Sequence, residues 1–209
     1  MRVGILGLQG CIEPHERMLS SLGVATLRVR LPTDLAHIDR IILPGGESTT
    51  MLTLLLRAEL LEPLQFFGRS KPMWGICAGA ILMAKEVEHP TQRSLELISL
   101  KATRNFYGSQ RESFKSLLTI DGEAFSDRTS ITLEADFIRA PLLSPLKESV
   151  KVLSRLDDQP VLFREGHLLA SSFHTELGSD TRLHEYFLGL PVAREATDSA
   201  AIDASHRAA

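Results

Sequence analysis

The chain has 209 residues, enough to bury a sizeable core, and its 44% hydrophobic and 23% charged residues are the balance of an ordinary globular protein. That composition excludes disorder across the whole chain, and a net charge of −3 with a pI near 6.2 argues against nucleic acid as a partner. The sequence has no apolar run near the roughly 20 residues of a membrane span and no signal-peptide pattern, so we expect a cytoplasmic protein without membrane contact. Its two cysteines are too few for a disulfide framework.

The first ninety residues alternate between short apolar runs and helix-like stretches. The runs predict buried strands at 3–8, 24–29, 40–43 and 71–76. A helix follows the first run, with Pro14 in its first turn and Gly23 just past its end. Ser48 and Thr49 are expected to cap a long second helix, and a third is expected over 78–86. This alternation predicts an α/β fold with three layers, a mostly parallel sheet between helices, of the flavodoxin-like kind.

From about residue 95 the pattern changes to strands joined by loops or short turns. The predicted strands are 97–102, 116–120, 150–156, 161–164 and 168–173, and a helix over 181–188 closes the fold. No linker separates this half from the first, so we expect an antiparallel extension of the same sheet in one domain, residues 1–191. Residues 192–209 contain no aromatic residue and are expected to form a poorly ordered tail.

One cysteine lies in a setting that favours nucleophilic catalysis. Cys77 has glycines two residues before and after it, Gly75 and Gly79, between a predicted strand and a predicted helix. This is the cysteine form of the nucleophile elbow, whose sharp turn lifts the reactive side chain above the sheet edge. The backbone N–H of Ala78 would then point toward a developing oxyanion. Cys11 lacks the paired glycines, and we interpret it as a small packed residue.

A thiolate nucleophile needs a base and a group that orients the base. His174 follows a predicted strand, and Glu176 lies two residues further on, so both side chains project to the same side of an extended backbone. The pair is the best candidate among seven histidines. His15, close to the carboxyl end of the first strand, is the other histidine of interest.

A glycine turn follows the third predicted strand. The segment Pro44-Gly45-Gly46-Glu47-Ser48 lies at the carboxyl edge of the sheet, where open α/β folds bind ligands. A glycine here lets a backbone N–H approach a second oxyanion position. The spacing is not that of a phosphate-binding loop, and alone the segment could be only a turn and a helix cap.

Together these segments resemble a known family, the class I glutamine amidotransferases, and within it the glutaminase subunits of pyridoxal 5′-phosphate synthase. The resemblance covers roughly residues 3 to 190. Its motifs are Gly7-Leu8-Gln9-Gly10, Gly45-Gly46-Glu47-Ser48-Thr49, Gly75-Ile76-Cys77-Ala78-Gly79, Arg104-Asn105 with Gly108 and Gln110, Phe137-Ile138-Arg139-Ala140-Pro141, and Ser172-Phe173-His174-Thr175-Glu176.

The resemblance implies a function and a set of site residues. Cys77, His174 and Glu176 would form a triad that hydrolyses L-glutamine to glutamate and ammonia, with oxyanion donors at Gly46 and Ala78. The ammonia would go to a partner, the (β/α)₈-barrel synthase subunit that makes pyridoxal 5′-phosphate. The residues implied in glutamine binding are Gly46, Glu47, Ser48, Arg104, Ile138 and Arg139. A guanidinium suits an amino-acid carboxylate, although from the sequence alone either arginine could equally be a surface charge.

No cofactor or metal is expected, because the chain has no Cys-x-x-Cys or His-x-x-x-His cluster. Two positions depart from the family pattern: Thr175 stands where proline is usual, and Ser109 replaces a basic residue. Three alternatives remain open at this point: the glutaminase of a different amidotransferase, a cysteine hydrolase or peptidase on a related fold, and a non-catalytic regulatory subunit.

Overall fold

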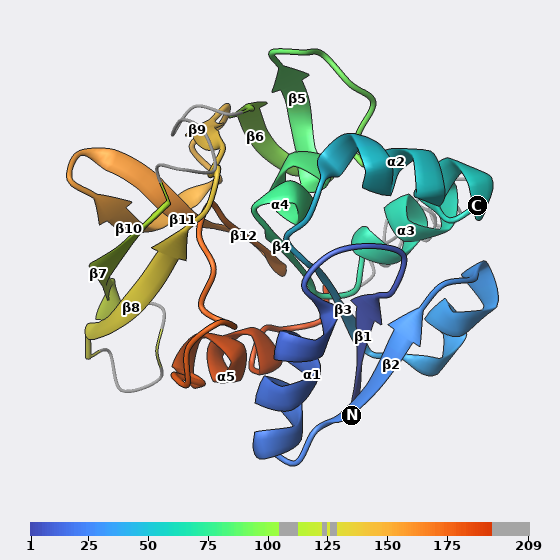
Figure 1. The fold of residues 1–209 in the computed structure, drawn as a ribbon, viewed down its shortest axis with the longest axis horizontal. Helices are drawn as coiled ribbons and strands as arrows, with labels where there is room; N and C mark the ends of the chain where they lie inside the picture. Colours follow the sequence, from blue (N-terminus) through green and yellow to red (C-terminus); the bar gives the residue numbers. More distant parts are fainter. Residues whose placement is uncertain (105–112, 123–124, 126–128, 194–209) are drawn as a thin grey trace, which may run out of the picture.

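The computed structural model describes residues 1–104, 113–122, 125 and 129–193. A nine-stranded sheet in the order β2-β1-β3-β4-β12-β11-β10-β7-β8 forms its centre, and a separate three-stranded sheet has the order β5-β6-β9 (Figure 1). The strands of the large sheet are β1 Arg2–Leu6, β2 Ala25–Val29, β3 Arg40–Leu43, β4 Met73–Ile76, β7 Phe114–Ile120, β8 Ile131–Phe137, β10 Lys151–Leu156, β11 Gln159–Glu165 and β12 Leu168–Ser171. The small sheet contains β5 Ala84–Glu88, β6 Ile98–Thr103 and β9 Leu142–Pro145.

The helices cover both faces of the large sheet. They are α1 Ile12–Ser21, α2 Ser48–Arg57, α3 Leu61–Gly68, α4 Ala78–Met83 and α5 Arg182–Leu188, with a 3₁₀ helix η1 at Pro32–His37. Alternate side chains of a strand point to opposite faces, and this divides the core in two. Ile41 and Leu43 pack in one cluster with α2, α3 and α4, whereas Ile42 packs in the other with α1 and α5. The helices α1 and α5 lie side by side in Figure 1.

The predicted fold class is confirmed, with helices on both sides of a mixed sheet. The five strands β2, β1, β3, β4 and β12 pair in parallel, and β11, β10, β7 and β8 continue the sheet antiparallel. Parallel strands end at the same edge, so the loops after β1, β3, β4 and β12 meet there. That edge carries the candidate site. The single-domain boundary at residue 191 stays a prediction, and most of the predicted tail lies outside the described residues.

The predicted helix over 78–86 is wrong in its last three residues. The helix ends at Met83, and β5 begins at Ala84. The returning segment after residue 93 takes the last helical carbonyls: the Leu95 N–H donates to Leu82 O at 2.7 Å and the Leu97 N–H to Met83 O at 3.0 Å. These bonds come from residues distant enough in sequence that local helical pattern could not reveal them.

Four further expectations need correction. The long helix after residue 48 is two helices, α2 and α3, separated at Glu59, whose φ is 55°. The N-cap of α2 is Glu47, not Ser48 or Thr49, and its carboxylate accepts from Thr49 N. Strands β8 and β9 occupy segments predicted as loops. The strand predicted at 97–102 is β6, which belongs to the small sheet rather than to the extension of the large one.

The described residues contain no helix that combines the length and the apolar character needed to cross a bilayer.

Close backbone packing at the sheet edge predicts a large effect of one glycine substitution. A Cβ on Gly79 would overlap the backbone carbonyl oxygen of Leu43, which cannot move without displacing β3. We expect Gly79→Ala to lower the free energy of unfolding by about 3 kcal/mol, measured by urea denaturation. The matched control is Gly189→Ala, where the nearest atom to a new Cβ is 3.5 Å away. Equal stabilities of the two variants would contradict this packing argument.

Candidate active site

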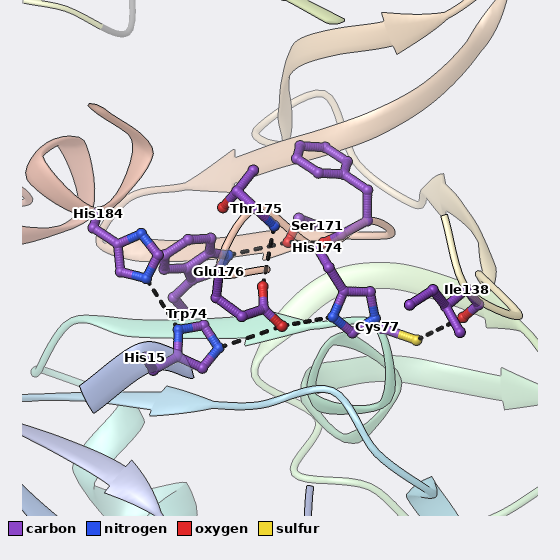
Figure 2. A network of polar contacts seen from close by, with 10 residues as sticks. His15, Trp74, Cys77, Ile138, Ser171, His174, Thr175, Glu176 and His184 are labelled. Atoms are coloured by element: carbon purple, nitrogen blue, oxygen red, sulfur yellow. Dashed lines mark hydrogen bonds and ion pairs between the residues drawn. The ribbon is translucent and has the colours of Figure 1, made fainter. Parts of the chain in front are cut away.

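Three adjacent strands deliver the candidate site to one edge of the sheet. β3 ends before the glycine turn at Gly45, β4 ends before Cys77, and β12 ends shortly before His174. Because β3, β4 and β12 are neighbours in the sheet, residues far apart in the sequence come together there. Figure 2 shows His174 lying between Cys77 and Glu176.

Cys77 is held in a backbone conformation that most residues avoid. Its φ is 50° and its ψ is −103°, directly between β4 and α4. The turn is fixed on both sides: the Cys77 N–H donates to Ser171 O at 2.8 Å, and Cys77 O accepts from the Ile81 N–H at 3.1 Å. A positive φ in a non-glycine residue at a site of this kind stores strain that the surrounding structure must maintain. This is the nucleophile elbow that the sequence predicted.

The two elbow glycines allow the strand and the helix to approach each other. A Cβ on Gly75 would lie 2.6 Å from Gly79 O. The glycine turn after β3 is equally tight, since a Cβ on Gly45 would overlap the His174 ring. Thus the His174 ring packs directly on the backbone of Gly45, and any side chain at that position would displace it.

His174 and Glu176 form a short buried pair. The distance from His174 Nδ1 to Glu176 Oε1 is 2.6 Å, and the other carboxylate oxygen accepts from the Thr175 N–H at 3.1 Å. His174 is also tied to β8 through a two-way backbone bridge with Asp136. Because the carboxylate faces Nδ1, Nε2 is left for the side of Cys77 (Figure 2).

The electrostatics of this pair favour a charged imidazole next to an ionised carboxylate. Burial lowers the pKa of His174, but its hydrogen bonds to Cys77 and Glu176 outweigh burial and raise the pKa well above the ordinary value. Burial likewise raises the pKa of Glu176, and the hydrogen bond and charge of His174 outweigh it, bringing the pKa to about 2. The Cys77 thiol itself donates to Ile138 O over 3.8 Å.

A cavity of about 140 Å³ opens above this chemistry. It is lined by every residue implied in catalysis or glutamine binding except Glu176, which lies buried behind His174. Its lining is Cys11, Gly46, Glu47, Ser48, Cys77, Ala78, Ile81, Arg104, Ile138, Arg139 and His174. A larger hollow, of about 540 Å³ and including Lys85 and His167, shares none of these residues. The smaller cavity is the candidate site because it contains the elbow.

Three charged side chains, Glu47, Arg104 and Arg139, give the cavity a polar wall. Arg104 Nη2 donates to Glu47 Oε1 at 3.0 Å, and the Arg104 side chain is only 9% exposed. Its other terminal nitrogen, Nη1, is buried and has no hydrogen-bond partner among the residues that the structure describes. A buried guanidinium N–H without an acceptor is costly, so it is suited to an anionic ligand group. Arg139 also lines the cavity, from a backbone with φ of 47°. Ser109, where the sequence departs from the family pattern, lies outside the described residues, as do the motif residues Asn105, Gly108 and Gln110.

Cys11 is the residue that sequence reasoning misjudged. It was interpreted as a packed residue, yet it lines the cavity, and its N–H donates to Gly45 O at 2.9 Å. Burial raises the pKa of its thiol. The available signal was topological, because Cys11 follows the carboxyl end of β1, which neighbours β3 in the sheet.

Cys11, His174 and Glu176 also form the one group of possible metal ligands among the described residues, with ligand atoms within 4.8 Å of one another. Two of the three are already hydrogen-bonded to each other at 2.6 Å. The donors are therefore engaged as an acid–base pair beside a thiol, and the expectation that the site uses no metal stays a prediction.

Comparisons with known proteins converge on one family. The model of the SNO glutamine amidotransferase family matches residues 5–192. A relative from Herpetosiphon aurantiacus, named pyridoxal 5′-phosphate synthase subunit PdxT, is 48% identical over 197 residues, which cover 91% of this chain and 100% of the relative.

Solved structures give the same answer at the level of the fold. A crystal structure described as a glutamine amidotransferase has a TM-score of 0.81 and 41% identity, covering 89% of this chain and 96% of that one. A structure of PurLQS from Thermotoga maritima has a TM-score of 0.65 at 17% identity, covering 90% and 97%, and shows likeness of fold alone.

The buried histidines next to this site predict that acid destabilises the fold. Burial lowers the pKa of His15 to about 4 and that of His184 to about 3, from 6.5. A lowered histidine pKa means that the unfolded state binds more protons, so stability is complete above pH 6.5 and is lost as pH falls toward these values. His174 acts with the opposite sign, because it is already protonated in the folded state and only the unfolded chain takes up its proton near pH 6.5, but this one group offsets only part of the loss from two. Glu176 adds little above pH 4.5, because its carboxylate is then mostly ionised in both states.

We therefore expect the free energy of unfolding in urea to fall by about 1 to 3 kcal/mol between pH 7 and pH 5. His184→Gln should reduce that slope by removing one of the two groups. A free energy of unfolding that is the same at both pH values would contradict the prediction.

Proposed function

Because the chain belongs to the SNO glutamine amidotransferase family, we propose that it hydrolyses L-glutamine through Cys77, His174 and Glu176 and supplies the ammonia to a pyridoxal 5′-phosphate synthase. The observation that carries the proposal is an elbow cysteine and a histidine that line one small cavity, with Glu176 buried behind the histidine. The name of the relative from Herpetosiphon aurantiacus supports the choice of pathway.

Glutamine would bind with its α-carboxylate near Arg104. The unpartnered Nη1 of that guanidinium supplies a buried donor, and Glu47 offers a carboxylate to the α-ammonium group. Ser48, Ile138 and Arg139 line the same cavity and would fix the remainder of the substrate. The side-chain amide must then reach Cys77, since only there do nucleophile and base meet.

The first chemical step is acyl transfer to sulfur. The Cys77 thiolate attacks the side-chain amide carbon, and backbone N–H groups near Ala78 and Gly46 stabilise the oxyanion. The raised pKa of His174 keeps its imidazolium available as the acid that protonates the departing ammonia. Glu176 stabilises that imidazolium through the 2.6 Å contact with Nδ1.

The second step regenerates the thiol. His174, now neutral, takes a proton from water, which attacks the thioester carbon and releases glutamate. Acyl transfer of this kind requires no cofactor. Free ammonia in water would be protonated and lose its nucleophilicity, so delivery through a dry passage to a synthase subunit fits the chemistry. The family resemblance implies that this subunit is a (β/α)₈ barrel.

The nucleophile assignment gives the first test. Cys77→Ser should abolish glutamine hydrolysis, because a serine hydroxyl ionises far less readily than a thiol and cannot replace the thiolate that attacks the amide, while folding should survive. In the complex with the synthase subunit, glutamine-dependent formation of pyridoxal 5′-phosphate should disappear and formation from ammonium salt should persist. Both are followed by absorbance of the product.

Cys11→Ala is the matched control, since it removes the other thiol of the cavity and should leave the nucleophile intact. Wild-type rates with glutamine in Cys77→Ser would contradict the assignment. Hydrolysis of peptides or esters in place of glutamine would instead favour a cysteine hydrolase.

The glycine turn gives the second test. The Gly45 carbonyl is engaged by the Cys11 N–H, and Gly46 is packed so closely against Gln9 that a Cβ there would lie 2.5 Å from Oε1. The Cys11 N–H thus fixes the orientation of the peptide that carries the Gly46 N–H, and we propose that docking of the synthase subunit aims that N–H at the oxyanion.

The isolated chain should therefore be a weak glutaminase that accelerates roughly 100-fold on docking, the effect of one oxyanion donor. Ammonia release with and without the synthase subunit measures this, with the Cys77→Ser complex as the blank. Equal rates in the two conditions would overturn the activation mechanism.

A further inference from the structure

Two buried histidines lie behind the Glu176 carboxylate and have no part in the steps above. His15 comes from α1 and His184 from α5, and both are 0% exposed (Figure 2). Neither lines the cavity, so neither can touch a substrate there. Buried polar side chains are expensive to keep unless they are paired, so their presence requires a reason.

The contacts form a continuous line toward the site. His184 Nε2 lies 3.0 Å from His15 Nδ1, and His15 Nε2 lies 3.7 Å from Glu176 Oε1, the same oxygen that His174 contacts. Trp74 forms a wall beside them, with its ring edge-on to His184 at a centroid distance of 4.9 Å. Apolar surroundings of this kind strengthen every remaining electrostatic interaction.

The Glu176 carboxylate determines which ring nitrogen of each histidine carries the proton. If His15 carried its proton on Nδ1, its Nε2 lone pair would face an ionised oxygen across 3.7 Å in a buried site, which is repulsive. If instead His184 Nε2–H donates to His15 Nδ1, then His15 carries its proton on Nε2 and turns an N–H dipole toward the carboxylate. Only the second arrangement is attractive at both contacts.

Both imidazoles are neutral in this arrangement. Burial is the main cause that lowers the pKa of each, and the nearby charge of His174 adds to it for His15. A neutral donor is what the site needs, because a second imidazolium would compete with His174 for Glu176. The titratable groups that act on the pair are Glu176 and His174, from the segment after β12.

We propose that His15 and His184 are positioning residues, a fixed-tautomer pair that holds the Glu176 carboxylate aimed at His174. The 3.7 Å contact is longer than a hydrogen bond and acts as a charge–dipole interaction, which shares the charge of the carboxylate and limits its rotation. The inference rests on the proposed role of Glu176 and extends the triad by two residues on its far side. The competing explanation is a polar tie between α1 and α5 with no effect on the chemistry.

The tautomers give a test that does not depend on activity. In protein labelled with ¹⁵N at histidine, two-bond correlation spectra at pH 7 should show both His15 and His184 as neutral rings protonated on Nε2. The signals of the two rings are assigned by their disappearance in His15→Gln and His184→Gln. A His15 ring protonated on Nδ1 would overturn the proposal even if the protein is an active glutaminase.

Kinetics then separate positioning from simple packing. His15→Phe keeps a ring but removes the donor, and we expect kcat for glutamine to fall about tenfold with KM within about twofold. His15→Gln retains an amide N–H that can reach the same oxygen and should recover kcat to within about threefold of the wild type. His167→Gln is the matched control, because His167 lies outside this cluster and its Nε2 contacts Gly68 O at 2.9 Å.

The pH profile supplies the readout that a packing role would not move. Without the His15 N–H, the carboxylate charge acts more strongly on His174, so the alkaline limb of kcat/KM should shift to higher pH in His15→Phe and stay in place in His15→Gln. If both variants have unchanged profiles and equal kcat, the pair is only a helix tie. If the wild type itself has no glutaminase activity in the complex, the proposed function fails. The tautomer measurement still tests the arrangement of His15 and His184, because it does not depend on activity.

Discussion

The strained turn at Cys77 is the constraint on which the candidate site depends. A φ of 50° persists because the N–H and the carbonyl of Cys77 are both fixed by hydrogen bonds, the first to Ser171 O and the second from the Ile81 N–H. Those bonds in turn require β4 and β12 to be adjacent and α4 to approach β3 as closely as Gly79 permits. The nucleophile is thus positioned by backbone contacts among three segments of the chain. Any change that separates β3 from α4 must therefore move the sulfur as well.

Much of this arrangement could be predicted from the sequence, because the features that produce it lie within a few consecutive residues. The glycine spacing around Cys77, the strand before it and the helix after it occupy a few consecutive residues, and the two-residue separation of His174 and Glu176 sets their common direction. The rest could not be predicted, because it depends on pairing across long separations. The helix after Cys77 stops at Met83 since residues beyond 93 take its carbonyls. In the same way, β9 is a strand because it pairs with β6, more than 35 residues earlier in the chain.

Cys11 shows where local reasoning fails in the opposite direction. Nothing in its immediate neighbours suggests a site, and yet the parallel order of β1 and β3 brings it to the cavity, where its backbone N–H holds the Gly45 carbonyl. An α/β sheet collects whatever follows the carboxyl ends of its neighbouring strands. A residue outside any recognised motif, such as Cys11, can therefore hold a peptide of a motif that lies more than thirty positions away in the sequence.

The three histidines around Glu176 show how a single carboxylate can be used from two sides. His174 contacts it at 2.6 Å, and this contact and the nearby thiol raise the pKa of the imidazole despite burial. His15 stands 3.7 Å from the same oxygen, and burial dominates there, so its pKa falls. The difference between the two rings is one of distance and partners rather than residue type. In an acyl-transfer reaction the ring that must carry a proton is the one nearest the thiol, and the ring that must remain neutral is the one behind the carboxylate. If both were charged, the second imidazolium would draw the carboxylate away from the first and weaken the acid that the leaving group requires. Burial of His15 and His184 against Trp74 prevents that competition without adding a charge to the site.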